Sequence, residues 1–253
     1  MSVGAVPGSA SASSESTALA SRLLAEKTAA LARLAAGIAH ELRNPLAVIL
    51  ARVQLLEIAM KGGKPLPPGK LEMTLRTVGE QAVRASKIIE SLSIFARPRS
   101  PELKSVDLRE TIGHVLSDIR AHMPQDGTVA TDVDVASEAM TVVADRGQLT
   151  TALKQLTLNA LQAMPDGGRL RIRARGGDGN VEVIVADTGT GVAPHDAPRI
   201  FDPFFSTKPS GAGLGLCVAQ TIAEAHGGSV RLVASDGPGA EFVLSLPTRR
   251  RVP

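Results

Sequence analysis

The sequence contains no tryptophan and no tyrosine, and only five phenylalanines. Its hydrophobic cores must therefore be built mainly from leucine, isoleucine, valine and alanine. Scarce aromatic residues also argue against a surface that stacks nucleobases, and the basic residues behind the net charge of +3 are scattered along the chain rather than clustered. We therefore expect no nucleic-acid partner.

Cysteine and long apolar runs are equally scarce. The single cysteine, Cys217, cannot form an internal disulfide, and no zinc-binding spacing is present. No apolar run approaches the ~20 residues that span a bilayer. The start of the chain also lacks the basic and apolar regions of a signal peptide. These absences predict a cytoplasmic protein that does not insert into a membrane.

Apolar periodicity divides the 253 residues into two parts. Residues 1–17 are rich in serine, alanine and glycine, show no apolar period, and are predicted to be a flexible leader. Leucine, isoleucine and valine then recur at steps of three and four over residues 31–56 and again over 71–92, which is typical of amphipathic helices. A run rich in proline and glycine at 61–70 separates them, so residues 18–97 are predicted to form an antiparallel helical hairpin.

A lone hairpin of this length leaves one apolar face of each helix uncovered. Pairing with a second copy into a four-helix bundle would bury these faces, so we predict a homodimer. Pro98 and Pro101 mark residues 98–105 as a linker and hinge. Residues 106–248 are predicted to form an α/β sandwich, followed by a basic tail at 249–253, so the fold class is α+β with several domains.

Short strand and helix patterns alternate in this second domain. We expect strands near Val142–Val143, Leu170–Ala174, Val181–Ala186, Ser229–Ala234 and Glu241–Leu246, and helices near Leu108–Arg120, Gly147–Met164 and Leu214–Ala225.

A polar cluster interrupts the first helix at the string AHELRNP. At ~100° per residue, His40 lies opposite the apolar stripe and is predicted to face solvent, with Glu41 and Asn44 close by. Pro45 removes the amide that would bond the Glu41 carbonyl, which predicts a kink. An exposed helix histidine is usually only a surface residue. A neutral imidazole is nevertheless a competent nucleophile toward phosphorus, and a neighbouring carboxylate could fix its tautomer.

Two segments of the second domain carry polar residues that suit a nucleotide. Asn159 lies on the polar face of a helix, where its amide oxygen could ligate Mg²⁺. Asp187 ends a buried strand, where its carboxylate needs a donor such as the adenine amine, and Gly189 and Gly191 would let the backbone approach the ring. Taken alone, Asn159 is more simply interpreted as a surface amide of a helix, and Asp187 as part of a hairpin turn.

A third segment, STKPSGAGLGL at residues 206–216, leads into a helix. Glycines ahead of a helix N-terminus expose amides that can cradle phosphate. The spacing fits neither the P-loop nor the dinucleotide-binding fingerprint. Phe201, Phe204 and Phe205, just before this segment, are expected to anchor a mobile lid by packing.

Together these segments resemble the two-component sensor histidine kinase family, in the family's order. HELRNP is similar to the phosphoacceptor box, LNALQAM to the N box, DTGTGV and GAGLGL to the two glycine boxes, and DPFFSTK to the F box. The string HELRNPL is most similar to soluble kinases of the nitrogen-regulation type. The resemblance covers residues 20 to 248 and implies a dimeric phosphotransfer domain followed by an ATP-binding domain of the Bergerat type.

The resemblance also implies a role for each matching residue. His40 would accept the phosphoryl group of Mg-ATP and Glu41 would orient it. Glu41 and Asn44 are similar to the family's phosphatase motif, which acts on a phosphorylated response regulator receiver domain. Asn159 would hold Mg²⁺ and Asp187 the adenine. The nucleotide loops would contain Gly189, Gly191, Thr207, Lys208, Gly211, Gly213, Leu214 and Gly215. The stimulus would come through a separate or missing sensor module.

Two positions depart from the family pattern. Gln155 stands where the family usually has a first asparagine. Gln162 stands where a basic residue often contacts phosphate, which leaves more phosphate charge for Lys208, Mg²⁺ and the loop amides. Two other functions stay open: an ATPase or serine kinase of the same nucleotide fold, and a catalytically silent scaffold that binds a receiver domain. In the first, transfer of label from ATP would survive His40→Gln, and in the second, ATP would bind without yielding phosphoprotein.

Overall fold

The computed structural model separates the chain into two units, residues 1–85 and 86–253. Side chains are described from residue 35 onward. The structure describes residues 9–63, 66–96, 99–120, 123, 128–177, 179–208, 212–233 and 238–248.

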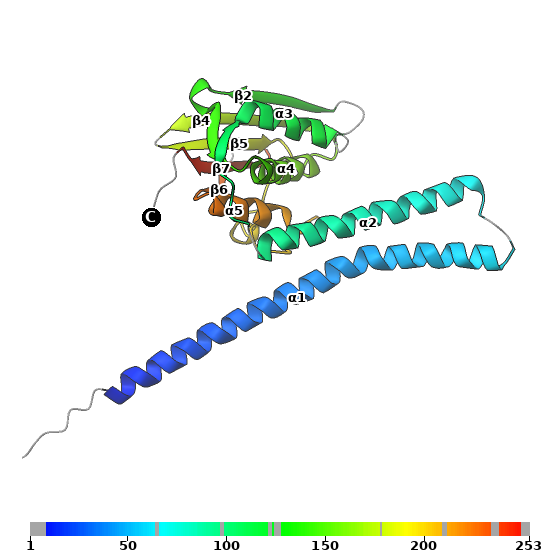
Figure 1. Ribbon diagram of the computed structural model, residues 1–253, viewed down its shortest axis with the longest axis horizontal. Coiled ribbons are helices and arrows are strands. Elements are labelled where there is room, and N and C mark those ends of the chain that lie inside the picture. The colour runs from blue at the N-terminus through cyan, green and yellow to red at the C-terminus, as the bar shows by residue number, and fades with distance from the viewer. Residues whose placement is uncertain are drawn as a thin grey trace, which may run out of the picture. The chain divides into compact units, whose positions relative to one another are not determined.

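Helices α1 (Ser9–Lys61) and α2 (Pro68–Ala96) form the predicted antiparallel hairpin, as Figure 1 shows. Gly63 ends α1 with a φ of 62°, a left-handed conformation that glycine adopts readily. Pro68 opens α2, where its missing amide costs no helical hydrogen bond. α1 begins at Ser9, inside the segment predicted to be a flexible leader. Residues 9–17 contain no glycine or proline, so nothing in their composition stops the helix from extending back.

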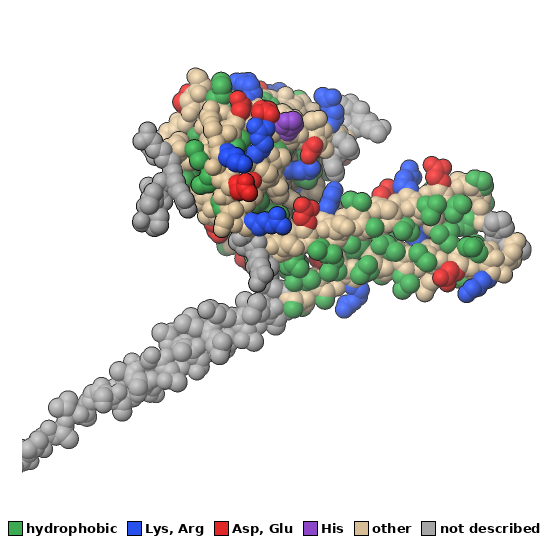
Figure 2. Space-filling view, viewed as in Figure 1, with side chains coloured by type: hydrophobic (Ala, Val, Ile, Leu, Met, Phe, Trp, Pro, Cys, Tyr) green, Lys and Arg blue, Asp and Glu red, His purple; other side chains and the backbone are tan. Residues whose placement is uncertain are grey.

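The hairpin exposes many large apolar side chains, which gather on the surface seen in Figure 2. Ile58 and Met60, for example, are 69% and 80% exposed. This apolar face consists of Leu46, Val48, Leu50, Val53, Leu55, Ile58 and Met60 of α1 and Leu71, Met73, Leu75, Val83 and Ile89 of α2. A patch of this kind marks an interaction surface, and it is what one half of a helical bundle would present.

The second unit contains a five-stranded mixed sheet. Its strands follow the order β2 (Val129–Val135), β4 (Gly168–Gly177), β5 (Asn180–Asp187), β7 (Glu241–Pro247) and β6 (Ser229–Val233). β2 and β4 run parallel, and every other neighbouring pair is antiparallel. A separate two-stranded sheet pairs β1 (Lys104–Asp107) with β3 (Thr141–Ala144).

Three helices cover one face of the large sheet (Figure 1): α3 (Leu108–Ile119), α4 (Arg146–Gln162) and α5 (Gly215–Ala225). Aspartates cap α3 and α4, since Asp107 accepts from the Glu110 amide at 2.8 Å and Asp145 from the Gln148 amide at 3.1 Å. Single 3₁₀ turns span Ser137–Ala139 and Ala197–Arg199. The core between helices and sheet is mostly leucine, isoleucine and valine, as the composition predicted.

All five strands and three helices expected in this unit are present, with bounds that differ by at most three residues. β1 and β2 were not anticipated. β2 has the sequence VATDVDV and lies at the sheet edge with mostly exposed side chains, so it lacks the apolar signal of a buried strand. Among the described residues, no helix combines the length and the apolar character that crossing a bilayer requires.

Candidate functional site

The predicted phosphoacceptor cluster lies on α1. His40 and Asn44 are exposed, as the helical geometry predicted. α1 continues through Pro45 and is bent rather than straight in Figure 1. Glu41 is partly buried, and its Oε2 accepts no hydrogen bond from any described group. The orientation of His40 by Glu41 therefore stays a prediction.

In the second unit, Asp187 ends β5 and is only 5% exposed. Its Oδ1 accepts from the amides of Gly189 at 2.9 Å and Ala240 at 3.3 Å. Its Oδ2 is buried and has no hydrogen-bond partner among the described groups. Burial raises the pKa of Asp187 above its usual value, although the two amides and the charge of Lys208 act in the opposite direction. A buried carboxylate oxygen without a donor is costly, so this oxygen is suited to accept from a ligand.

The turn after Asp187 packs against the C-terminal end of α4. A side chain at Gly189 would collide with the carbonyl of Ala163, and the Thr190 amide donates to that same carbonyl at 3.1 Å. Gly191 has a φ of 70°, which disfavours any other residue. This close approach places the predicted glycine turn beside the helix that carries Asn159.

Lys208 lies between the helix that carries Asn159 and the strand that ends at Asp187. Its Nζ donates to Asn159 Oδ1 at 2.9 Å and to the Asn159 carbonyl at 3.0 Å. Burial lowers the pKa of Lys208, and the nearby charge of Asp187 partly offsets this effect. The structure thus brings together Asn159, Asp187 and Lys208, which lie in three separate segments of the sequence. Thr207 is exposed.

The glycine-rich segment leads into the N-terminus of α5. Gly213 has a φ of 66°, and a side chain there would overlap the backbone of Phe204 and Phe205. Its carbonyl accepts from the Phe204 amide at 2.9 Å. α5 begins at Gly215, and Leu214 before it provides no side-chain cap. Within the part of the chain that the structure describes, the first amides of the helix can therefore bind an anion. Gly211 lies outside the described residues.

Two of the three phenylalanines ahead of this segment make ring contacts, while their anchoring of a lid stays a prediction. Phe201 meets Phe242 of β7 edge to face, with 6.4 Å between ring centroids. The Arg199 guanidinium lies 4.7 Å from the centre of the Phe205 ring, within the range of a cation–π contact.

The two departures from the family pattern have different surroundings. Gln155 lies against α5, so that a side-chain carbon at Gly215 would stand 2.9 Å from its Oε1. Gln162, in contrast, is exposed. No described group of three or more His, Cys, Asp or Glu side chains could hold a metal ion. A magnesium ion at Asn159 would therefore take its other ligands from phosphate oxygens and water.

Sequence reasoning missed the loop that supports Asp187 from the other side. The Ala240 carbonyl accepts from the Asp187 amide at 3.0 Å, and the Ala240 amide donates to Asp187 Oδ1. Gly239 packs directly on the Asp187 carbonyl with a φ of 100°. The available signal was the string Gly237-Pro238-Gly239 before the last strand, which alone indicates only a turn.

Replacing Gly239 by alanine is expected to destabilise the second unit by about 2 kcal/mol or more, because it adds a clash to a strained φ. The matched control is Gly179→Ala, where φ is 78° but no atom lies within 4 Å of the new carbon. Denaturant unfolding of both variants measures the difference. An equal loss of unfolding free energy in both variants would show that the contact between Gly239 and Asp187 contributes nothing to stability.

Two family models match the chain. The His Kinase A phospho-acceptor domain matches residues 30–101, and the histidine kinase-, DNA gyrase B- and HSP90-like ATPase matches residues 144–250. The sensor histidine kinase ZraS of Escherichia coli K12 is 34% identical over 224 residues, which are 88% of this chain and 46% of that protein. The histidine-protein kinase AtoS of the same strain is 35% identical over 228 residues, 88% of this chain and 36% of the relative.

The chain thus spans less than half the length of these curated relatives. Among solved structures, full-length ShkA in complex with AMPPNP is 30% identical with a TM-score of 0.63, and the match covers 85% of this chain and 45% of ShkA. The fold, the order of the two matched domains and the motifs of both units agree with these similarities. The chain belongs to the sensor histidine kinase family.

Proposed function

We propose that this chain is the core of a sensor histidine kinase that transfers the γ-phosphoryl group of Mg-ATP to His40. The phosphoryl group then passes to an aspartate of a response regulator receiver domain. Asp187 carries the nucleotide half of the proposal, because one of its buried oxygens is held by the protein's own amides while the other has no donor. The ShkA structure contains an ATP analogue, which supports the same ligand for this fold.

The described contacts support specific roles around the nucleotide. The free Asp187 oxygen would accept from the adenine amine, and Gly189 and Gly191 would admit the ring to the backbone. The open first turn of α5, preceded by Gly213, would bind phosphate through its amides and the positive end of the helix dipole. The segment with Thr207 and Gly211 belongs to the lid in this proposal.

Asn159 fits the proposed magnesium site, since its amide oxygen is a hard neutral ligand next to the phosphate-binding turn. When bound, Mg²⁺ would neutralise charge on the transferred phosphoryl group. In this structure the Lys208 ammonium donates to the same oxygen. Lys208 must therefore leave Asn159 when the nucleotide enters, and its charge then becomes available to phosphate at a site where Gln162 offers none.

The chemistry at His40 follows from its exposure. One neutral ring nitrogen attacks the γ-phosphorus, the bond from phosphorus to the β,γ-bridging oxygen breaks, and ADP leaves. Glu41 can accept a hydrogen bond from the other ring nitrogen as positive charge develops. Asn44, exposed one turn further on, would position water for the phosphatase activity, in which water attacks the phosphorus of the phosphorylated receiver, the bond to the aspartate oxygen breaks and inorganic phosphate leaves.

The regulator half of the proposal can be tested with a panel of purified receiver domains. The phosphorylated chain is expected to transfer label rapidly to one receiver, and the His40→Gln chain to none. Retention of label on the chain with every receiver would favour a different acceptor. A sensor module would supply the stimulus.

The apolar face of the hairpin supports a homodimer. Placing charge on this face by the double substitution Leu50→Arg and Leu75→Arg is expected to convert the dimer to monomer, because both side chains are more than half exposed in the single chain. Light scattering after size-exclusion chromatography gives the mass. The control Asp134→Arg places a new charge on the exposed strand β2 of the second unit, outside the apolar face, and should stay dimeric. A variant that still forms a full dimer would contradict the assignment of this face.

A further inference from the structure

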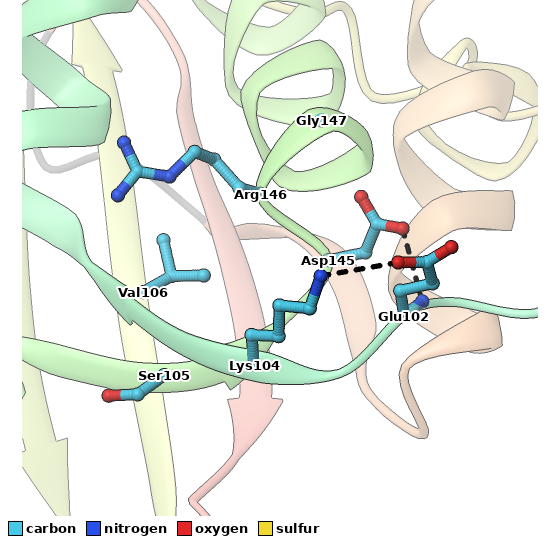
Figure 3. Close-up of a pocket in the computed structure, with 7 residues that line it drawn as sticks. All are labelled: Glu102, Lys104, Ser105, Val106, Asp145, Arg146 and Gly147. Atoms are coloured by element: carbon cyan, nitrogen blue, oxygen red, sulfur yellow. Dashed lines mark hydrogen bonds and ion pairs between the residues drawn. The ribbon is translucent and has the colours of Figure 1, made fainter.

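The segment that precedes β1 is hydrogen-bonded to the first turn of α4. The Glu102 amide donates to Asp145 Oδ2 at 3.1 Å, and Gln148 Nε2 donates to the Arg99 carbonyl at 3.1 Å. Figure 3 shows Glu102 and Asp145 facing each other across this junction. Residues 99–103 lie in the stretch predicted to be a hinge, yet they are attached to the nucleotide-binding unit at two points.

The two carboxylate oxygens of Asp145 accept hydrogen bonds from different segments. Oδ1 accepts from the Gln148 amide and caps α4, while Oδ2 accepts from Glu102. Burial favours the neutral acid, but hydrogen bonds from the amides of Gln148, Glu102 and Gly147 outweigh it and lower the pKa of Asp145. The ionised carboxylate can therefore hold both partners at once.

His226 holds the backbone of Asp145 from the other side. It is 8% exposed, lies at the C-terminal end of α5, and takes no part in the proposed chemistry. Its Nε2 lies 3.0 Å from the Asp145 nitrogen, which can only donate, so Nε2 accepts and the ring proton resides on Nδ1. Nδ1 then donates to the Ile222 carbonyl at 2.8 Å. The chain of contacts runs from Glu102 to the helix whose first turn would bind phosphate.

A pocket of about 370 Å³ lies beside this junction, between β1 and the first turn of α4 (Figure 3). Its lining includes Glu102, Asp145 and Arg146, and it opens to solvent. The hydrogen bond of the Glu102 amide is itself exposed, so water can replace Asp145 when the bond breaks. The contact can therefore open without leaving the Glu102 amide unsatisfied.

We propose that Asp145 acts as a latch that makes residues 99–103 part of the nucleotide-binding unit and thereby shortens its tether to the phosphoacceptor helices. With both bonds closed, the connection runs from the end of α2 at Ala96 to Arg99, which Gln148 holds. With the Asp145 bond open, one exposed bond alone holds this segment, and the connection can extend to β1 at Lys104. A longer tether lowers the effective concentration of one site near the other. Asp145 is then a positioning residue for transfer to His40, a role that rests on the proposed function.

Asp145→Asn tests the latch with little risk to folding. Asparagine is as good a helix cap as aspartate, so its oxygen can keep the Gln148 amide, but its amino group cannot accept from Glu102. The matched control is Asp107→Asn, which changes the corresponding cap of α3 and has no bond to this segment. Gln148→Ala removes the other attachment point, at Arg99.

Limited trypsin digestion of the full chain reports opening directly. Cleavage after Arg99 is informative, because Arg97 is followed by Pro98 and resists trypsin. We expect Asp145→Asn and Gln148→Ala to speed this cleavage at least about threefold through local opening, and Asp107→Asn to leave it at the wild-type rate. Wild-type cleavage rates in both latch variants, or an equal increase in the Asp107 control, would overturn the proposal.

Kinetics then separate positioning from mere stability. Asp145→Asn is expected to lower kcat for His40 phosphorylation by about two- to fivefold while the KM for ATP stays within about twofold. An unchanged kcat alongside faster cleavage would also overturn the positioning role. A wild-type chain that fails to phosphorylate His40 would refute the proposed function. Digestion does not depend on kinase activity, so the cleavage rates would still test whether Asp145 holds residues 99–103.

Discussion

The His40→Gln variant is expected to bind ATP with wild-type affinity and to incorporate no γ-phosphoryl group. Glutamine keeps an exposed polar side chain on α1, so neither the hairpin nor the nucleotide-binding unit should lose stability. It lacks a nucleophilic ring nitrogen, however, and transfer has no alternative acceptor in the proposed reaction. Labelling with γ-labelled ATP measures transfer, and titration with a fluorescent ATP analogue measures binding.

Asn44→Ala provides the matched control for this variant. Asn44 is exposed on the same helix, one turn from His40, and is assigned to the phosphatase activity alone. Its substitution should leave labelling intact and reduce dephosphorylation of the receiver. Continued labelling of the His40→Gln chain, on a residue stable to acid, would support the rival serine kinase instead.

The Asp187→Asn variant is expected to weaken ATP binding at least tenfold. In aspartate, one oxygen serves the amides of Gly189 and Ala240 and the other is free. The asparagine oxygen can keep the loop amides, which leaves its amino group where the adenine amine must donate. Loss of a hydrogen bond to a charged group costs about 1.5–3 kcal/mol, or roughly 10- to 100-fold in affinity.

The same carboxylate predicts how binding depends on pH. The ionised form of Asp187 accepts from adenine, and burial raises the pKa of this group, so ATP affinity should fall as pH falls through a range above that of an ordinary aspartate. Asp187→Asn should remove this dependence. Asp166→Asn, on an exposed turn after α4, is the control and should bind ATP like the wild type. Wild-type affinity in Asp187→Asn would contradict the proposed adenine contact.

The elements that could be predicted are those with a strong local pattern. Apolar periodicity located α1, α2, α4 and α5, and the valine-rich run of β5 marked a buried strand. β2 was missed because an exposed edge strand with aspartates at Asp132 and Asp134 carries no such pattern. The start of α1 was misplaced because a serine- and alanine-rich segment satisfies both a flexible and a helical interpretation.

The candidate site was predictable only in part, for a similar reason. Motif order in the sequence pointed to Asn159, Asp187 and Lys208, yet nothing in it indicated that Lys208 would donate to Asn159, 49 positions away. The contacts of the latch are of similar or longer range, since Asp145 meets Glu102 and His226 across separations of 43 and 81 residues. Such contacts depend on how strands and helices pack, which short-range patterns do not encode.

Mass spectrometry of the wild-type chain after incubation with Mg-ATP, performed at neutral to alkaline pH, tests the central claim most directly. The account predicts one phosphoryl group on the peptide that contains His40, lost in acid and stable in alkali. A phosphoryl group on any other residue, or unmodified protein that has nevertheless bound ATP, would contradict it.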